Sequence, residues 1–319
     1  MQLDKTLSFV SFALLLAACS GESPSAATSS DFPDSASGND GAMADGATPD
    51  TDRNADAGMR DGSVPDAHEA RSCPAGMVLV PAGPFVMGSD TGSVDERPKH
   101  TVTLSSYCLD TTEVTNGSYR ACSDSGGCLA RTAFGSRTRN SYYGDPAYDR
   151  YPMIELNWNA AKAYCTWASK RLPTEAEWEK AARGGCELQS PATCGPEDER
   201  EYPWGDAVPT CTLANFSNCL PGGGDTDLVG ARPAGDSPYQ AHDLAGNVAE
   251  WVSDYYYSDY LSCAGGCSDP AGPPTGQDRV YRGGSYSILS SESRVARRFA
   301  LTSGGSDPTI GFRCATAPH

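Results

Sequence analysis

The sequence is poor in basic residues. Its 24 lysines and arginines face 41 aspartates and glutamates, which gives a formal net charge of −17. Proteins that bind nucleic acids carry a basic face or stripe that neutralises phosphates, and this sequence contains no such stripe. The shortage of positive charge therefore argues against a nucleic-acid partner.

The sequence also lacks the pattern of a zinc site. It contains no Cys-x-x-Cys pair, and its four histidines are scattered along the chain. Structural zinc sites combine cysteines and histidines at short, regular spacings. Zinc is therefore not expected, and His100 and His242 are interpreted as ordinary loop residues.

No apolar stretch is long enough to cross a membrane. The run at residues 6–18 is shorter than the roughly 20 residues that a spanning helix needs, and small polar residues follow it. Residues 1–18 are therefore predicted to be a signal peptide. Its end, "LAAC", resembles a bacterial lipoprotein cleavage box, which implies that Cys19 carries a lipid and that the protein reaches the outer membrane. The alternative is an ordinary signal peptide followed by a chance cysteine.

Residues 19–72 have almost nothing to bury. They are rich in Ala, Ser, Gly, Asp and Pro, and eleven acidic residues outnumber three arginines. Such a composition cannot offset the entropy of folding, so this segment is predicted to be a disordered linker.

Residues 73–319 are long enough to form one domain with a large core. Twelve of the thirteen cysteines lie here, and an even number in an exported chain indicates disulfides. Local disulfides can form between cysteines that are close in sequence, although the sequence alone does not fix the connectivity. The close pairs are Cys122 and Cys128, Cys186 and Cys194, Cys211 and Cys219, and Cys263 and Cys267.

Strands are indicated by short apolar or alternating runs at residues 77–80, 85–87 and 101–104. Residues 159–169 carry apolar side chains at helical spacing. A second helix is predicted up to residue 183, because Thr174 and Glu177 form a capping-box pattern. Beyond residue 185 the chain is rich in Gly and Pro, so little regular structure is expected there.

Nine segments of this domain occur in the order of a known family. They include "MVLVPAGPFVMGSD", "LDTTEVTN", "RLPTEAEWEKAARGG", "DLAGNVAEWVSD", "RVYRGGSY" and "GFRC". Together they resemble the formylglycine-generating enzyme (sulfatase-modifying factor) domain over residues 73–319. The resemblance implies an α+β, complex C-type-lectin-like fold with low regular secondary structure and many disulfides.

The family's reference activity oxidises a cysteine of a sulfatase to formylglycine, with a copper ion held by two cysteines. Counted from "GGSY", those two positions fall at Ile288 and Ser293, and residues 285–313 contain no cysteine. Because Cu(I) prefers soft thiolate ligands, copper is not expected and no catalytic residue is assigned. A related branch uses iron and three histidines on an added helical domain, which this chain lacks.

The resemblance also implies calcium. In the family the turn that reads "DLAGNVAE" here supplies a side-chain oxygen, two backbone carbonyls and a glutamate. The matching residues are Asp243, Gly246, Val248 and Glu250. Hard oxygen ligands on a glycine-containing turn suit Ca²⁺, and the alternative is an acidic turn without an ion.

A second family calcium site begins at an "AN" pair and ends in an aspartate-containing loop. Here the pair supplies Asn215 and the carbonyl of Phe216, and the loop offers Asp225 or Asp227. The loop is shorter than usual in the family, and an acidic turn without an ion is again the alternative.

Three arginines, Arg282, Arg294 and Arg298, flank the region that forms the peptide groove in active family members. They could bind an acidic ligand. Pairing with Glu292, Asp307 or other carboxylates on the surface is the interpretation that we favour, because exposed ion pairs are common.

The resemblance pairs Cys165 with Cys314. With Cys73 and Cys108 and the four local pairs, six disulfides would use every cysteine of the domain. The sequence therefore predicts a lipid-anchored, calcium-stabilised binding or structural module, with a cell-surface protein or peptide as its ligand. A divergent formylglycine-generating oxidase is the alternative.

Overall fold

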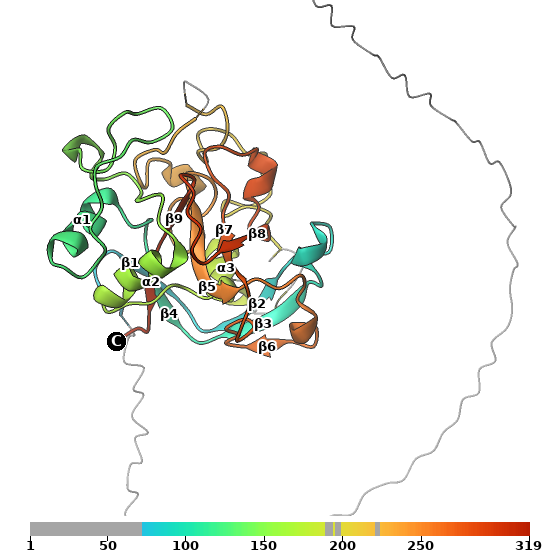
Figure 1. Ribbon diagram of the computed structural model, residues 1–319. Coiled ribbons are helices and arrows are strands. Elements are labelled where there is room, and N and C mark those ends of the chain that lie inside the picture. The colour runs from blue at the N-terminus through green and yellow to red at the C-terminus, as the bar shows by residue number, and fades with distance from the viewer. Residues whose placement is uncertain (1–71, 189–193, 195–198, 221–223) are drawn as a thin grey trace, which may run out of the picture. The chain divides into compact units, whose positions relative to one another are not determined.

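The computed structural model describes residues 72–188, 194, 199–220 and 224–319 (Figure 1). The predicted signal peptide, the lipidation site Cys19 and the linker up to residue 71 lie outside these ranges, so they stay predictions. Within these ranges, no helix is long and apolar enough to cross a membrane.

The first sheet brings the two ends of the domain together. Strand β4 (Tyr107–Asp110) pairs antiparallel with β1 (Met77–Val80) on one side and with β10 (Ala315–Thr316) on the other. Next to this sheet, the amide of Ser72 donates to the carbonyl of His319 at 3.3 Å, and the reverse bond measures 3.0 Å. The first and last described residues therefore lie side by side.

The second sheet lies at the lower right of the coloured domain in Figure 1. In it β3 (His100–Leu104) pairs antiparallel with β2 (Gly83–Met87) and parallel with the short β6 (Cys267–Ser268). Strands β1, β2 and β3 confirm the three strands that the sequence predicts at the start of the domain.

The third sheet is the largest, with the order β8 (Arg298–Thr302), β7 (Asp278–Arg282), β5 (Ala249–Tyr255) and β9 (Ile310–Phe312). Beyond residue 185 the described strands are few and short, as expected, but the sequence did not predict that four of them form this sheet. Most of β5 is buried, including four consecutive residues. A strand covered on both faces shows no alternation of apolar and polar residues, so its pattern gave no signal.

Helices α2 (Trp158–Trp167) and α3 (Glu175–Arg183) confirm the two predicted helices. The capping box also forms: the hydroxyl of Thr174 accepts from the amide of Glu177, whose carboxylate accepts from the amide of Thr174. These two bonds satisfy amides that a helix start would otherwise leave unpaired.

Helix α1 (Asn116–Asp124) was not expected, because its glycine and serines are weak helix formers. Thr115 caps it, and Tyr119 and Cys122 are buried against the rest of the domain. Tertiary packing therefore holds this helix. Short 3₁₀ turns complete the described structure at Val94–Glu96, Pro146–Tyr148, Cys186–Leu188, Pro233–Gly235, Leu261–Cys263 and Ser290–Ser293.

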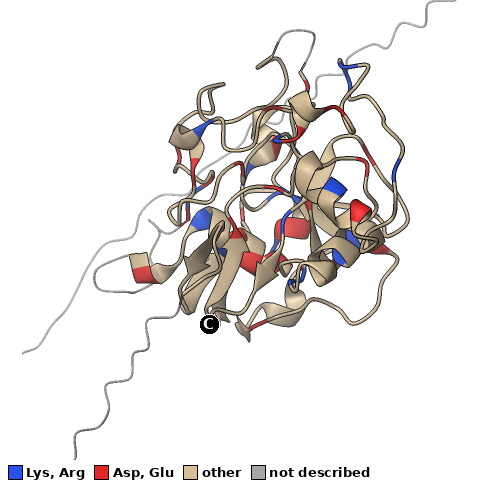
Figure 2. Ribbon diagram, turned by 90° about the vertical axis from the view of Figure 1, so that its left-hand side faces the viewer, with Lys and Arg blue, Asp and Glu red and all other residues tan. Residues whose placement is uncertain are grey.

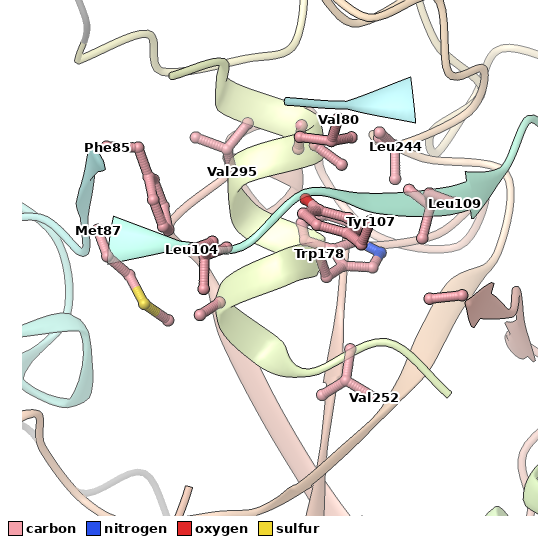
Figure 3. Packing of buried hydrophobic residues seen from close by; sticks show 14 of the residues in the cluster. Val80, Phe85, Met87, Leu104, Tyr107, Leu109, Trp178, Leu244, Val252 and Val295 are labelled. Atoms are coloured by element: carbon pink, nitrogen blue, oxygen red, sulfur yellow. The ribbon is translucent and has the colours of Figure 1, made fainter. Parts of the chain in front are cut away.

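Helix α3 lies at the centre of the core, and all nine of its residues are buried. Figure 3 shows Trp178 of this helix among side chains from several strands, including Tyr107 and Leu109 of β4 and Val252 of β5. Charged side chains on such a helix need partners, because an unpaired buried charge is strongly unfavourable.

Candidate functional site

The two positions that the family resemblance assigns to the copper cysteines lie side by side. They follow β7, after the turn at Gly283 and Gly284, whose φ angles are 90° and 70°. A Cβ atom on Gly284 would lie 2.5 Å from Oγ of Ser293 and 2.9 Å from Cδ1 of Ile288. The two side chains thus converge on one glycine.

The chemistry of this pair is not that of a copper site. Ser293 is buried, and its hydroxyl has no hydrogen-bond partner within the described ranges. Ile288 offers only carbon atoms. A serine hydroxyl and an aliphatic side chain cannot replace two thiolates, which are the ligands that select Cu(I).

Every cysteine from Cys73 onward is in a disulfide, so the described part of the chain holds no free thiol. A disulfide sulfur is neither a nucleophile nor a thiolate ligand. The six pairs agree with those expected: Cys73–Cys108, Cys122–Cys128, Cys165–Cys314, Cys186–Cys194, Cys211–Cys219 and Cys263–Cys267.

The predicted calcium turn is buried, but its glutamate is already engaged. Both carboxylate oxygens of Glu250 accept hydrogen bonds from Arg313 at 2.7 Å, and the indole of Trp178 donates to one of them at 2.8 Å. Asp243 accepts the amide of Gly230 at 2.6 Å through Oδ2. Binding of calcium by Glu250 stays a prediction, and it would require the contacts with Arg313 to open.

Glu113 lies beside Asp243 and was missed by the sequence analysis. Its Oε1 accepts from Nδ2 of Asn247 at 2.8 Å, whereas its buried Oε2 has no partner within the described ranges. Burial raises the pKa of both carboxyls, and the negative charge of Asp243 raises that of Glu113 further. Glu113 belongs to the segment "LDTTEVTN", which carries part of the family resemblance but was assigned no role.

In the second predicted set, Asn215 resembles Glu113 in having a buried oxygen, Oδ1, without a partner in the described chain. Its Nδ2 donates to the carbonyl of Asp225 at 2.9 Å and to Oδ1 of Asn247 at 3.3 Å. Asn247 therefore links Asn215 to Glu113. The two sets also touch directly, because a Cβ atom on Gly246 would lie 2.4 Å from the carbonyl oxygen of Asn215.

The two candidate aspartates of the second set are engaged elsewhere. Oδ2 of Asp225 accepts from both the hydroxyl and the amide of Thr138, at 2.7 and 2.9 Å, and from Ser136 at 2.6 Å. Although burial acts to raise it, these hydrogen bonds hold the pKa of Asp225 below its usual range. Asp227 pairs with Arg232 at 2.7 Å.

The three arginines near the family's groove pair with carboxylates, as favoured, but these pairs lie in the interior. Arg298 contacts Glu175 of α3 at 2.7 and 2.9 Å, and Arg282 contacts both Glu175 and Glu179. Arg294 forms a two-pronged pair with Glu96 at 2.8 Å.

The ion pairs of Arg298 and Arg282 stabilise the ionised form of Glu175 on α3. Although burial opposes it, Arg298 and Arg282 lower the pKa of Glu175 below its usual range. Figure 2 shows acidic and basic positions intermixed along the described ribbon. The arginines near the groove are thus parts of the fold and are not free to meet an acidic ligand.

Residues 63–318 match the family described as "Sulfatase-modifying factor enzyme 1-like domain". Among curated proteins, the chain is 36% identical over 250 residues to the serine/threonine-protein kinase pkn1 of Chlamydia caviae. That match covers 75% of this chain but only 37% of the kinase. The formylglycine-generating enzyme of Thermomonospora curvata is 32% identical over 297 residues, covering 76% of this chain and 94% of the enzyme.

The structure of PvdO from Pseudomonas aeruginosa is also similar. It has a TM-score of 0.58 and 28% sequence identity, and the match covers 75% of this chain and 93% of PvdO. The fold is therefore the C-type-lectin-like α+β fold that the resemblance implied. The chain belongs to the family of sulfatase-modifying factor enzyme 1-like domains, which includes formylglycine-generating enzymes.

Proposed function

We propose that this protein is a binding or structural module at the cell surface and has no oxidase activity. The observation that carries the proposal is the packing of Ile288 and Ser293 over Gly284, at the place where the family resemblance requires two thiolates. With all twelve cysteines of the domain in disulfides, no thiolate is left in the described chain to replace them.

The proposed module is held at the outer membrane by a lipid on Cys19 and presents its loops to a cell-surface protein or peptide. The six disulfides support export to an oxidising compartment, where such bonds persist. Cys19→Ser should move the protein from the membrane fraction to the soluble fraction. Unchanged fractionation of this variant would contradict the lipid anchor.

Calcium is the proposed stabilising ion. Around the predicted turn, Asp243 and Glu113 offer carboxylate oxygens, and Gly246 and Val248 offer backbone carbonyls. Two buried carboxyls beside each other, one with an unpartnered oxygen, fit a hard divalent cation that would relieve their repulsion. Asn215 Oδ1, with the carbonyl of Phe216, is the corresponding candidate at the second position. A bound ion would supply charge neutralisation and cross-linking of loops.

The alternative is a divergent formylglycine-generating oxidase. It is supported by the similarity to the Thermomonospora curvata enzyme over almost the whole of that protein. It would require oxidation of a protein cysteine by residues other than a thiolate pair.

A peptide assay separates the two functions. The purified protein is incubated with copper and a peptide that contains Cys-x-Pro-x-Arg, and the peptide is analysed by mass spectrometry. We expect no formylglycine, and thiol titration of the denatured, unreduced domain should find no free thiol. Product formation or two titratable thiols would support the oxidase instead.

The double variant Ile288→Cys/Ser293→Cys is the matched control. It places two thiols at adjacent positions and should gain Cu(I) binding that the parent protein lacks. If the parent protein binds Cu(I) as tightly as the double variant, the proposed loss of the copper site is wrong.

A further inference from the structure

A cavity of about 600 Å³ opens beside α3 and is lined in part by Glu175 and Arg298. It lies among the N-terminal end of α3, the second sheet, and the two loops around Leu261–Cys263 and residues 270–274. Neither Ile288 nor Ser293 lines it. The volume is within the range of roughly 300–1,000 Å³ that is usual for small-molecule sites.

The walls of this cavity are mostly apolar. Met87, Ala176 and Tyr260 are buried at its inner side. At the mouth, Tyr257 and Leu261 are 60% and 68% exposed. Exposed large apolar side chains at the rim of an apolar cavity are typical of a binding site, since they would gain contacts from an occupant.

Two charged side chains in the cavity wall, Arg298 and Glu175, form an ion pair with each other. Arg298 donates to both oxygens of Glu175 and also to the carbonyls of Asp95 and Tyr257, at 2.7 and 2.9 Å. Glu175 additionally accepts from the hydroxyl of Tyr260 at 3.2 Å. This pair contributes shape and rigidity to the wall but little net charge.

Asp254 differs from that pair, because no cation contacts it within hydrogen-bond distance in the described chain. It is 4% exposed, and both hydrogen bonds that it accepts, from the amide of Glu175 and the hydroxyl of Ser253, end on Oδ2. Oδ1 faces Gly272, where a Cβ atom would lie 2.8 Å away. The carboxyl thus keeps an acceptor atom at the cavity wall, next to a loop whose backbone can come this close because residue 272 is a glycine.

The surroundings of Asp254 disfavour the ionised form of its carboxyl group. Burial, and then the negative charge of Glu175, raise its pKa to about 7. Asp259 adds a further acidic side chain to the lining. An anionic occupant would face these acids, whereas a cationic group would satisfy Oδ1 of Asp254.

We propose that this cavity binds a small apolar molecule that carries a primary amine. The ammonium group contacts Asp254 through Oδ1, and the apolar part packs against Tyr257, Tyr260 and Leu261. The site is separate from the proposed calcium positions and from the Ile288–Ser293 pair, so it stands independently of the proposed function.

The test uses three probes of one shape on the purified full-length chain: phenethylamine, 2-phenylethanol and phenylacetate. Isothermal titration calorimetry at pH 8 should show that phenethylamine binds about tenfold more tightly than 2-phenylethanol, as expected for one charge-assisted hydrogen bond. Phenylacetate should show no binding. A folded protein that binds neither the amine nor the alcohol would overturn the proposal.

Two kinds of variant locate the site and its chemistry. Asp254→Asn keeps an acceptor for the amide of Glu175, and it should remove the preference for amine over alcohol. Leu261→Ala and Tyr257→Ala change exposed rim residues that the fold does not need, and they should weaken both probes by a similar factor. Asp124→Asn, at the end of α1, is the charge-matched control and should change nothing.

The variants also define how the proposal fails. An amine preference that persists in Asp254→Asn, or probe affinities that both rim variants leave unchanged, would contradict it. The rim variants decide the location even if Asp254→Asn does not fold.

Discussion

Two buried polar networks of this domain differ in how they balance charge. Around α3, the carboxylates of Glu175 and Glu179 meet the guanidinium groups of Arg282 and Arg298. Around Asn247, the carboxyls of Glu113 and Asp243 lie beside each other, linked to the amide of Asn215. We call these the arginine network and the acid–amide network.

The buried atoms without a hydrogen-bond partner also differ between the two networks. In the arginine network the unpartnered atom is a donor, Nε of Arg282. In the acid–amide network, two acceptors have no partner among the residues that the structure describes: Oε2 of Glu113 and Oδ1 of Asn215. A cation can serve acceptors but not a donor. The difference teaches that the first network balances its buried charges within the polypeptide, whereas the second keeps oxygen acceptors that the proposed calcium ion would use.

The largest predicted effect is in the arginine network. Arg282→Met would remove the guanidinium group from one oxygen of each of the buried carboxylates Glu179 and Glu175, which keep Arg183 and Arg298 as their other partners. Removing one partner of such a buried pair costs about 3–5 kcal/mol of the free energy of unfolding. Urea denaturation followed by tryptophan fluorescence measures the loss. A change below about 1 kcal/mol would mean that this pair does not hold α3 in place.

Calcium removal should have the next largest effect, and it acts on the other network. At a calcium concentration one hundred times the dissociation constant, the ion adds about 2.7 kcal/mol to the free energy of unfolding. EDTA should therefore lower the melting temperature, and Asp243→Asn should remove this sensitivity.

Glu250→Gln tests which carboxylates bind the ion. If Arg313 keeps Glu250 engaged, this variant is less stable but still responds to EDTA. If Glu250 is a ligand, the response disappears. A melting temperature that EDTA leaves unchanged in the parent protein would contradict a stabilising calcium ion.

A smaller effect, measured over one pH unit, is expected from Asp254, which lies beside the arginine network and has no hydrogen bond to a cation within the described residues. Because the folded protein retains the proton of Asp254 up to its pKa of about 7, while the unfolded chain releases it near pH 4, this residue stabilises at low pH. The contribution falls as the pH rises between these values, by at most about 1.4 kcal/mol per pH unit. The slope between pH 5.5 and 6.5 should therefore be less negative in Asp254→Asn than in the parent protein; equal slopes would contradict the assignment.

The smallest effect is expected at the surface. Arg297 pairs with Glu292, which is 40% exposed at its side chain. Arg297→Ala should lower the free energy of unfolding by less than about 1 kcal/mol, because water screens such pairs. This variant is also the control for Arg282→Met. If both variants lowered the free energy of unfolding by the same amount, buried and exposed ion pairs would not differ in their contribution to stability.

The sequence predicted features that depend on neighbouring residues or on the motifs of a known family. The capping box at Thr174 fixed the start of α3, and the family resemblance paired Cys165 with Cys314 across 149 residues. Counting from "GGSY" pointed to Ile288 and Ser293, whose side chains both lie close to Gly284.

What the sequence did not predict depends on contacts between distant segments. In the third sheet, β5 is buried along most of its length and β9 throughout, so no alternation of apolar and polar residues marked these two strands. The engagement of Glu250 by Arg313 spans 63 residues, and the role of Glu113 depends on Asn247, 134 residues away. Side-chain partners of this kind are set by tertiary packing, which a pattern of residue types does not encode.

The disulfide between Cys73 and Cys108 has a mechanical consequence. It joins the first residues of the domain directly to β4, the middle strand of the first sheet, close to the residues Ser72 and His319 that bond to each other. A pulling force applied through Ser72 would pass across this covalent bond to β4 instead of running along the intervening chain. Residues 74–107, which contain β1, β2 and β3, would therefore bear no tension, and the second sheet could not be unravelled from its end by a load on the N-terminal side.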